Sequence, residues 1–352
     1  MLSPGFLLRL AAIVLIAAAG LAGYEYGKSE AGTAREAKAE RRGAYDAAFQ
    51  SRLDSSERAA NRRGYEDGLK EGRADGNLAG LLAAKKVLAK REKRKKEEAR
   101  ARKVIWAVGD GADGGSAGRA VAAMIASRSP DRFLYLGDVY DGRDLAEFDG
   151  DYGNTFGRFN SLASPTPGNH EWSSHESGYD PYWERAKGRP QPPWYEVRVA
   201  GWQLLSLNSE TSHGPGSPQL RWLEGKLRRT PQIGDCRLGF WHRPYISAGN
   251  YEGDGGDLAP IWNALSGRTR LVVTGHDHNM QRFAPRDGIT HLISGAGGHG
   301  HYPVGSAPGL QFANDDTYGA LRLLLGPGRA DFAFFSTAGK RLDSGSVTCR
   351  RE

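Results

Sequence analysis

Cysteine is scarce in this chain of 352 residues. Only Cys236 and Cys349 are present, and neither belongs to a Cys-x-x-Cys pair or lies beside a histidine motif. The spacing therefore gives no support to a thiolate-bound metal site. Two distant cysteines behind an N-terminus that resembles an export signal predict one disulfide, and two buried free thiols are the alternative. The disulfide would place this part of the chain outside the cytoplasm.

An excess of positive charge is missing from most of the chain, although the net charge is +7. Residues 1–103 carry 23 Lys and Arg against 14 Asp and Glu, whereas the remainder carries 25 against 27. The basic character therefore belongs to the N-terminal region. The C-terminal part is slightly acidic, so we expect no specific nucleic-acid partner.

Long apolar runs are also rare, and the clearest one lies at the N-terminus. Residues 10–23 are uncharged and follow Arg9; counted from Phe6, the run approaches the roughly 20 residues that span a bilayer. We predict that residues 1–27 are a membrane anchor, with a cleaved signal peptide as the alternative. The basic residues after the run favour a cytoplasmic location of the chain that follows. We give the predicted disulfide more weight and expect a membrane-anchored or secreted, extracytoplasmic domain.

Proline is absent from residues 28–103, and large apolar residues are few there. This composition predicts a charged helical stalk. Each glycine in a helix interior costs about 1 kcal/mol relative to alanine, so a regular stripe of them favours close helix packing in a coiled coil or homo-oligomer. A flexible, solvated linker is the alternative. The stripe recurs at every fourth residue, at Gly64, Gly68, Gly72, Gly76 and Gly80.

Residues 104–352 have the pattern of an α/β domain. Apolar runs at 104–108 and 133–136 flank a helical pattern at 118–128, which predicts parallel strands joined by a helix. The second half is richer in strands and in glycine loops. We therefore predict two packed β-sheets flanked by helices, a four-layer αββα sandwich. The further expected strands are 202–207, 238–241, 271–274, 291–294, 319–325 and 330–335, and the further helices are 219–229 and 257–265.

Five short motifs each follow an apolar run. Ligands in parallel sheets bind at the carboxyl ends of the strands, so these motifs should meet. Aspartate, asparagine and histidine ligands without cysteine favour Fe, Mn or Zn, and together they supply the parts of a two-metal hydrolytic site. The motifs are Gly109-Asp110, Gly137-Asp138, Gly168-Asn169-His170-Glu171, Trp241-His242 and Gly275-His276-Asp277-His278.

This ordered set resembles the calcineurin-like metallophosphoesterases, closest to their purple-acid-phosphatase-like bacterial branch, over Val104 to Cys349. The resemblance implies hydrolysis of phosphate esters, with phosphomonoesters favoured, by hydroxide generated on two metal ions. It implies that His170 is the general acid that protonates the leaving alkoxide. It also implies that Asp138 bridges the metals, that Asp110 and His278 hold the first metal, and that Asn169, His242 and His276 hold the second.

The sequence departs from this family at the first metal. Relatives carry a histidine two residues after the first aspartate, where this chain has Ala112. The purple acid phosphatases carry a tyrosine three residues after the bridging aspartate, where this chain has Asp141, and the tyrosine is one earlier, at Tyr140. Tyr140, Asp141 or water would then complete the first metal. A non-catalytic stalked module that binds phosphorylated ligands with a degraded metal site is the competing hypothesis.

The other histidines carry weaker expectations. His299 and His301 lie in a glycine-rich stretch, residues 295–302, that shapes a substrate pocket or forms a surface loop. His175 either lines the mouth of the site or lies on the surface. We expect structural roles for His213 and His291.

Overall fold

The computed structural model describes residues 51, 55, 58–59, 61–70, 83–93, 101–140, 142–229, 236–250 and 254–349. The chain divides into two units, Met1–Arg94 and Lys95–Glu352. The predicted anchor, residues 1–27, lies outside the described residues, and no helix among those described is long and apolar enough to cross a membrane. Within the predicted stalk, residues 61–70 and 83–93 are helical and almost entirely exposed. Its oligomerisation stays a prediction.

The first sheet of the second unit has six strands in the order β13-β12-β11-β1-β2-β3. Strands β1, β2 and β3 run parallel to one another. Strand β11 pairs antiparallel with β1, and β12 and β13 continue the sheet in antiparallel pairs. The strands are β1 (Lys103–Val108), β2 (Arg132–Tyr135), β3 (Ala163–Pro165), β11 (Gly319–Gly326), β12 (Arg329–Ser336) and β13 (Arg341–Thr348).

The second sheet has seven strands in the order β10-β8-β9-β7-β6-β5-β4. Its centre, β5, β6, β7 and β9, is parallel, and its edges are antiparallel. The strands are β4 (Tyr195–Val199), β5 (Trp202–Ser206), β6 (Arg237–Phe240), β7 (Leu271–Thr274), β8 (Met280–Phe283), β9 (Thr290–Ser294) and β10 (Leu310–Asn314).

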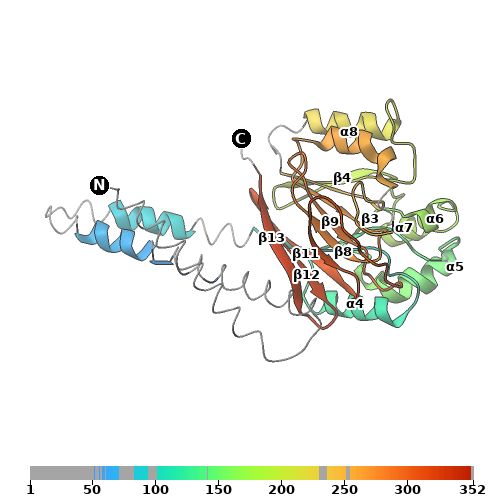
Figure 1. Ribbon diagram of the computed structural model, residues 1–352, viewed down its shortest axis with the longest axis horizontal. Helices are drawn as coiled ribbons and strands as arrows, with labels where there is room; N and C mark the ends of the chain where they lie inside the picture. Colours follow the sequence, from blue (N-terminus) through green and yellow to red (C-terminus); the bar gives the residue numbers. More distant parts are fainter. Residues whose placement is uncertain are drawn as a thin grey trace. The chain divides into compact units, whose positions relative to one another are not determined.

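Helices cover the outer face of each sheet, and Figure 1 shows α4 and α8 on opposite sides of the strands. Aromatic side chains of α5 and α7 join the cluster on the first sheet, and leucines of α8 and α9 join the cluster on the second. The helices are α4 (Ser116–Ala126), α5 (Leu145–Phe148), α6 (Asn169–Trp172), α7 (Tyr179–Lys187), α8 (Pro218–Arg229) and α9 (Ala259–Leu265), with shorter turns at η1 (Asp149–Gly153), η2 (Gly157–Phe159) and η4 (Asp254–Leu258).

The side-chain alternation of β1 shows how the layers are built. Ile105 and Ala107 belong to the cluster between the two sheets, whereas Trp106 and Val108 belong to the cluster under the helices. All four side chains are fully buried, so this strand is covered on both faces, as a parallel strand inside a layered α/β fold must be. The predicted arrangement of two sheets flanked by helices is confirmed.

One disulfide joins the two sheets. Cys236 and Cys349 are bonded, with their Cα atoms 5.0 Å apart and a sequence separation of 113. Cys236 immediately precedes β6 and Cys349 immediately follows β13. The predicted disulfide is therefore present, and it ties the C-terminal strand to the strand that leads into His242.

Candidate metal centre

The five predicted motifs meet at one edge of the two sheets. Asp110 follows β1 and Asp138 follows β2, while His242 follows β6 and His276 follows β7. Because β1 runs parallel to β2 and β6 runs parallel to β7, the carboxyl ends of these strands bring the side chains together. Asn169 begins α6, which follows β3.

Three of these residues have an unusual backbone. Asp110, Asp138 and His276 have φ angles of 60°, 63° and 69°, a left-handed region that non-glycine residues rarely adopt. Each such residue costs of order 1–3 kcal/mol and persists only where the surrounding structure imposes it. That all three follow a central strand and face the same cluster indicates that these turns are held for function.

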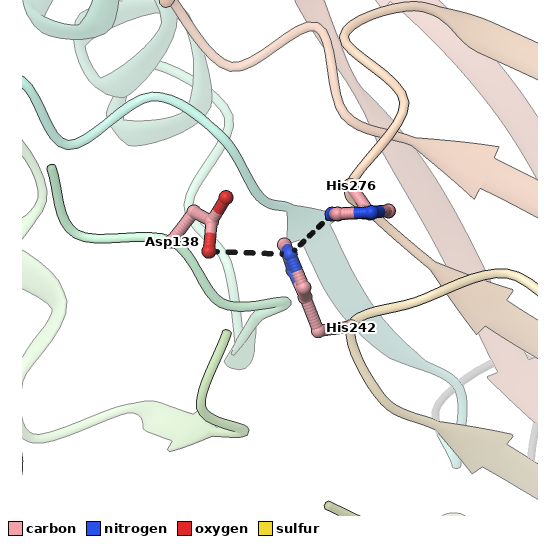
Figure 2. Close-up of side chains that lie close together, drawn as sticks. All are labelled: Asp138, His242 and His276. Atoms are coloured by element: carbon pink, nitrogen blue, oxygen red, sulfur yellow. Dashed lines mark hydrogen bonds and ion pairs between the residues drawn. The ribbon is translucent and has the colours of Figure 1, made fainter. Parts of the chain in front are cut away.

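The first group of converging side chains surrounds His242. Its Nδ1 lies 2.8 Å from the carbonyl oxygen of Leu136, so Nδ1 carries a proton and Nε2 of the neutral ring has a lone pair. That Nε2 atom lies 3.2 Å from Oδ1 of Asp138, and Figure 2 shows the ring between Asp138 and His276. Nδ1 of His276 lies 2.9 Å from Nε2, and Oδ1 of Asn169 lies 3.0 Å from it.

This group fits a cation. Two of the atoms around Nε2 are oxygens with no hydrogen to donate, so without a positive charge their lone pairs would repel each other. The attraction of this group for a positive charge is seen in the pKa of His242. Complete burial alone would lower this pKa, but the Asp138 carboxylate raises it to about 10. The same attraction overcomes burial at Asp138 and lowers its pKa to about 2.

A second group consists of Asp110, Asp138 and His278. Their ligand atoms all lie within 4.8 Å of one another, as do those of Asp138, His242 and His276. Oδ2 of Asp110 accepts the backbone N–H of His276 at 2.9 Å. Oδ1 of Asp110 is buried and accepts no hydrogen bond from the described residues; Nε2 of His278 is 3.8 Å away. A buried carboxylate oxygen without a donor is costly, and a cation would satisfy it.

Asp138 belongs to both groups, which is the position that a bridging carboxylate must occupy. The position of Ala112 adds no ligand: the alanine is fully buried and its carbonyl oxygen accepts the N–H of Tyr140 at 2.8 Å. The hydroxyl of Tyr140, in contrast, lies 2.7 Å from Nε2 of His278 and so reaches the second group. Asp141 lies outside the described residues.

His170 lies at the open side of the centre. Its side chain is 47% exposed, and Nε2 is 3.9 Å from Oδ2 of Asp138. Its backbone N–H donates to Oδ1 of Asp138 at 3.2 Å, which fixes the turn beside the carboxylate. An exposed imidazole next to a buried carboxylate is placed to meet a group that arrives from solvent.

Glu171 is a site residue whose role the sequence reasoning missed. It is fully buried, and its two carboxyl oxygens accept the backbone N–H of Gly168 at 2.9 Å and of Val139 at 3.1 Å. Burial and, secondly, the charge of Asp138 raise its pKa to about 8. The carboxyl group thereby links the turn after Asp138 to the turn that presents Asn169 and His170. Its signal was its place at the end of the Gly-Asn-His-Glu motif.

The remaining histidines divide into two sets. Nδ1–H of His213 donates to the carbonyl oxygen of Thr211 at 2.6 Å, and Nε2 lies 3.4 Å from Oδ2 of Asp257. His291 is buried, with Nε2 3.0 Å from the Thr274 hydroxyl. His175 stacks on Trp172. His299, by contrast, stacks on Tyr140, so the stretch 295–302 does reach the centre.

Comparison with known proteins agrees with this geometry. A region of 157 residues is 28% identical to "Probable purple acid phosphatase 20" of Arabidopsis thaliana, covering 37% of this chain and 36% of that protein. A region of 174 residues is 25% identical to "Purple acid phosphatase" of Glycine max, covering 42% of this chain and 37% of that protein. The match thus spans little more than a third of either plant protein.

Two solved structures share the fold. The Plasmodium protein GAP50, titled "the anchor in the inner membrane complex", superposes with a TM-score of 0.57 at 15% identity, over 72% of this chain and 90% of its own. Purple acid phosphatase PPD1 from yellow lupin seeds superposes with a TM-score of 0.55 at 17% identity, over 70% of this chain and 54% of its own. The model of the family "Calcineurin-like phosphoesterase" matches residues 103–280, just over half of the chain. This chain belongs to the calcineurin-like phosphoesterase family.

Proposed function

We propose that this protein hydrolyses phosphate esters, preferably phosphomonoesters, at a centre of two metal ions. The observation that carries the proposal is the pair of ligand groups that share Asp138. In this proposal Asp110, His278 and Tyr140 hold the first metal. Asn169, His242 and His276 hold the second.

Two metal ions of the Fe, Mn or Zn type would neutralise the phosphoryl oxygens and make water nucleophilic near neutral pH. The protein contributes orientation: hydrogen bonds to the Leu136 and Gly300 carbonyls fix the rings of His242 and His278 so that Nε2 faces the centre. Such partners of a ligating histidine set its tautomer and its basicity.

His170 supplies the proton for the leaving alkoxide in this proposal. Its partial exposure and its closeness to Asp138 support that role, and a positioned general acid typically contributes 10²–10⁴-fold to the rate. The plant relatives, which are named as phosphatases, support the preference for monoesters. The disulfide supports an extracytoplasmic location, because such bonds persist in oxidising compartments.

The test uses the purified full chain, stripped of metal and reloaded with Mn, Fe or Zn. We expect hydrolysis of p-nitrophenyl phosphate that requires metal and exceeds hydrolysis of bis(p-nitrophenyl) phosphate. With an alkyl phosphate monoester as substrate, His170→Asn should lower kcat 10²–10⁴-fold and keep two metals per chain, and His175→Asn is the matched control that should keep both. If no metal restores hydrolysis while the circular dichroism spectrum stays native, the proposal fails.

The competing function is a non-catalytic module that binds phosphorylated ligands. Two observations favour it: Ala112 replaces a family histidine, and one of the proteins that share this fold, at 15% identity, is titled an anchor. Metal stoichiometry discriminates between the two functions. Two bound ions with turnover support the enzyme, whereas one or none with retained binding of inorganic phosphate supports the module.

A further inference from the structure

The glycine-rich loop, residues 295–302, packs backbone to backbone against the turn that carries Asp110. The backbone N–H of His299 donates to the carbonyl oxygen of Asp110 at 2.9 Å. A Cβ atom added at Gly297 would lie 2.1 Å from the carbonyl oxygen of Gly109, so only glycine permits this approach. The loop is therefore built into the first metal's side of the centre.

Two aromatic rings of this loop stack on the side chains of Tyr140 and His278, which contact each other at 2.7 Å. His299 stacks on Tyr140 with ring centroids 3.8 Å apart and planes 17° apart. Tyr302 stacks on His278 at 3.8 Å and 13°. The same loop accepts the Nδ1–H of His278 through the Gly300 carbonyl oxygen at 2.6 Å. One loop thus holds both rings in place.

A carboxylate fixes the His299 ring in turn. Nδ1 of His299 lies 3.1 Å from Oδ2 of Asp113, and Oδ1 of Asp113 accepts the backbone N–H of Gly115 at 2.8 Å. Asp113 directly follows Ala112. The turn that lacks the family histidine therefore provides a carboxylate that orients an imidazole from a distant loop.

We propose that His299 and Asp113 are positioning residues that hold the Tyr140 hydroxyl beside His278 as an oxygen ligand of the first metal. His299 and Asp113 together form a clamp on Tyr140, and this clamp offsets the loss of a ligand at Ala112. The stacked ring of His299 restricts the orientation of the Tyr140 ring, and the hydrogen bond to Asp113 restricts the orientation of His299. Hydrogen-bond partners orient ligating side chains at other metal sites in the same way. The inference rests on the proposed function in that it requires a metal at the first group.

The experiment loads the metal-free full chain with ferric iron and measures two quantities: bound iron per chain, and the visible absorption band that arises when a phenolate coordinates iron(III). Wild type should bind two ions and show the band, and Tyr140→Phe should abolish the band. His299→Ala should lose the band and weaken iron binding at the first site 10–100-fold, the usual effect of removing an orienting partner, while the second site stays filled.

Two further variants separate the parts of the clamp. His299→Phe keeps a stacked ring without the Asp113 hydrogen bond and should retain part of the band, and Asp113→Asn should weaken it. His175→Ala is the matched control, because His175 also stacks on an aromatic ring and contacts an aspartate, Asp180, at 2.7 Å. It should leave the band and both ions unchanged.

The inference is overturned if His299→Ala keeps the wild-type band and first-site affinity, or if wild type binds two ions without the band. Either result leaves metal-dependent hydrolysis untouched, so the proposed hydrolysis would stand; two ions without the band would remove only Tyr140 from the proposed ligands. Conversely, a protein that shows the band but hydrolyses no phosphate ester would refute the proposed function and support the clamp.

Discussion

The buried carboxyl group of Glu171 gives the sharpest test of how the centre is assembled. It joins two turns by accepting the N–H groups of Gly168 and Val139. Glu171→Ala would leave both buried donors without their acceptor, and each lost partner costs about 1–3 kcal/mol. We therefore expect the free energy of unfolding of the metal-free protein to fall by about 2–6 kcal/mol. Glu171→Gln keeps one acceptor oxygen and should cost about 1–3 kcal/mol.

Glu171→Ala should also weaken metal binding, because the two turns that Glu171 joins carry Asp138 and Asn169. We expect a 10–100-fold loss of affinity for Mn²⁺. Urea unfolding of the metal-free chain and calorimetric titration of Mn²⁺ would measure the two effects. Glu147→Ala is the control: Glu147 also accepts a backbone N–H, from Arg143 at 3.0 Å, but at an exposed position, where it should cost under about 1 kcal/mol. If Glu171→Ala matches wild type in both assays, the carboxyl group does not organise the centre.

Three further predictions follow from the same structure. Cys236→Ser should lower the free energy of unfolding by about 4–5 kcal/mol, the chain-entropy value for so long a closed loop, and reductant added to wild type should reproduce the loss in urea unfolding. In the metal-free protein, the raised pKa of His242 means that the protonated ring stabilises the fold fully below pH 6.5, and this contribution is lost as the pH rises through about 10. His242→Gln should therefore remove this pH dependence from the midpoint of urea unfolding. Adding metal at about 100 times its Kd should stabilise the protein by roughly 2.7 kcal/mol, measured as a rise in Tm that a chelator reverses.

Much of the fold was predictable because its central strands are continuous apolar runs. The run at Val104–Val108 and the run at Leu271–Thr274 are buried on both faces, so composition alone marks them. The strands that escaped prediction are short or lie at sheet edges: β3 has three residues, and β10 alternates between partly buried and exposed positions. The helix expected at 257–265 begins instead as the 3-10 turn η4, and α9 starts only at Ala259, where Pro260 fits the first turn.

The residues around His242 were identifiable because Asp138, His242 and His276 closely follow strands and Asn169 begins the helix after β3. Their sequence motifs therefore already encode their places. Their ligand roles stay part of the proposed function. The backbone strain at Asp110, Asp138 and His276 has no sequence signature other than the glycine before each residue. Glu171 was visible as a motif letter, and its partner Gly168 lies only three residues before it. Its second partner, Val139, is 32 residues away in sequence and is known only from the folded chain.

The group of Asp110, Asp138 and His278 behaves differently because the contacts around it join distant parts of the chain. His299 and Asp113 are 186 residues apart, and Tyr140 and His278 are 138 apart. No periodicity or local spacing connects such pairs. A motif comparison that stops at Ala112 therefore finds a ligand missing, whereas the folded chain brings the Tyr140 hydroxyl and the stacked His299 ring to the same group. The absence of a family residue at one position is weak evidence for a lost site when loops from other strands converge on it.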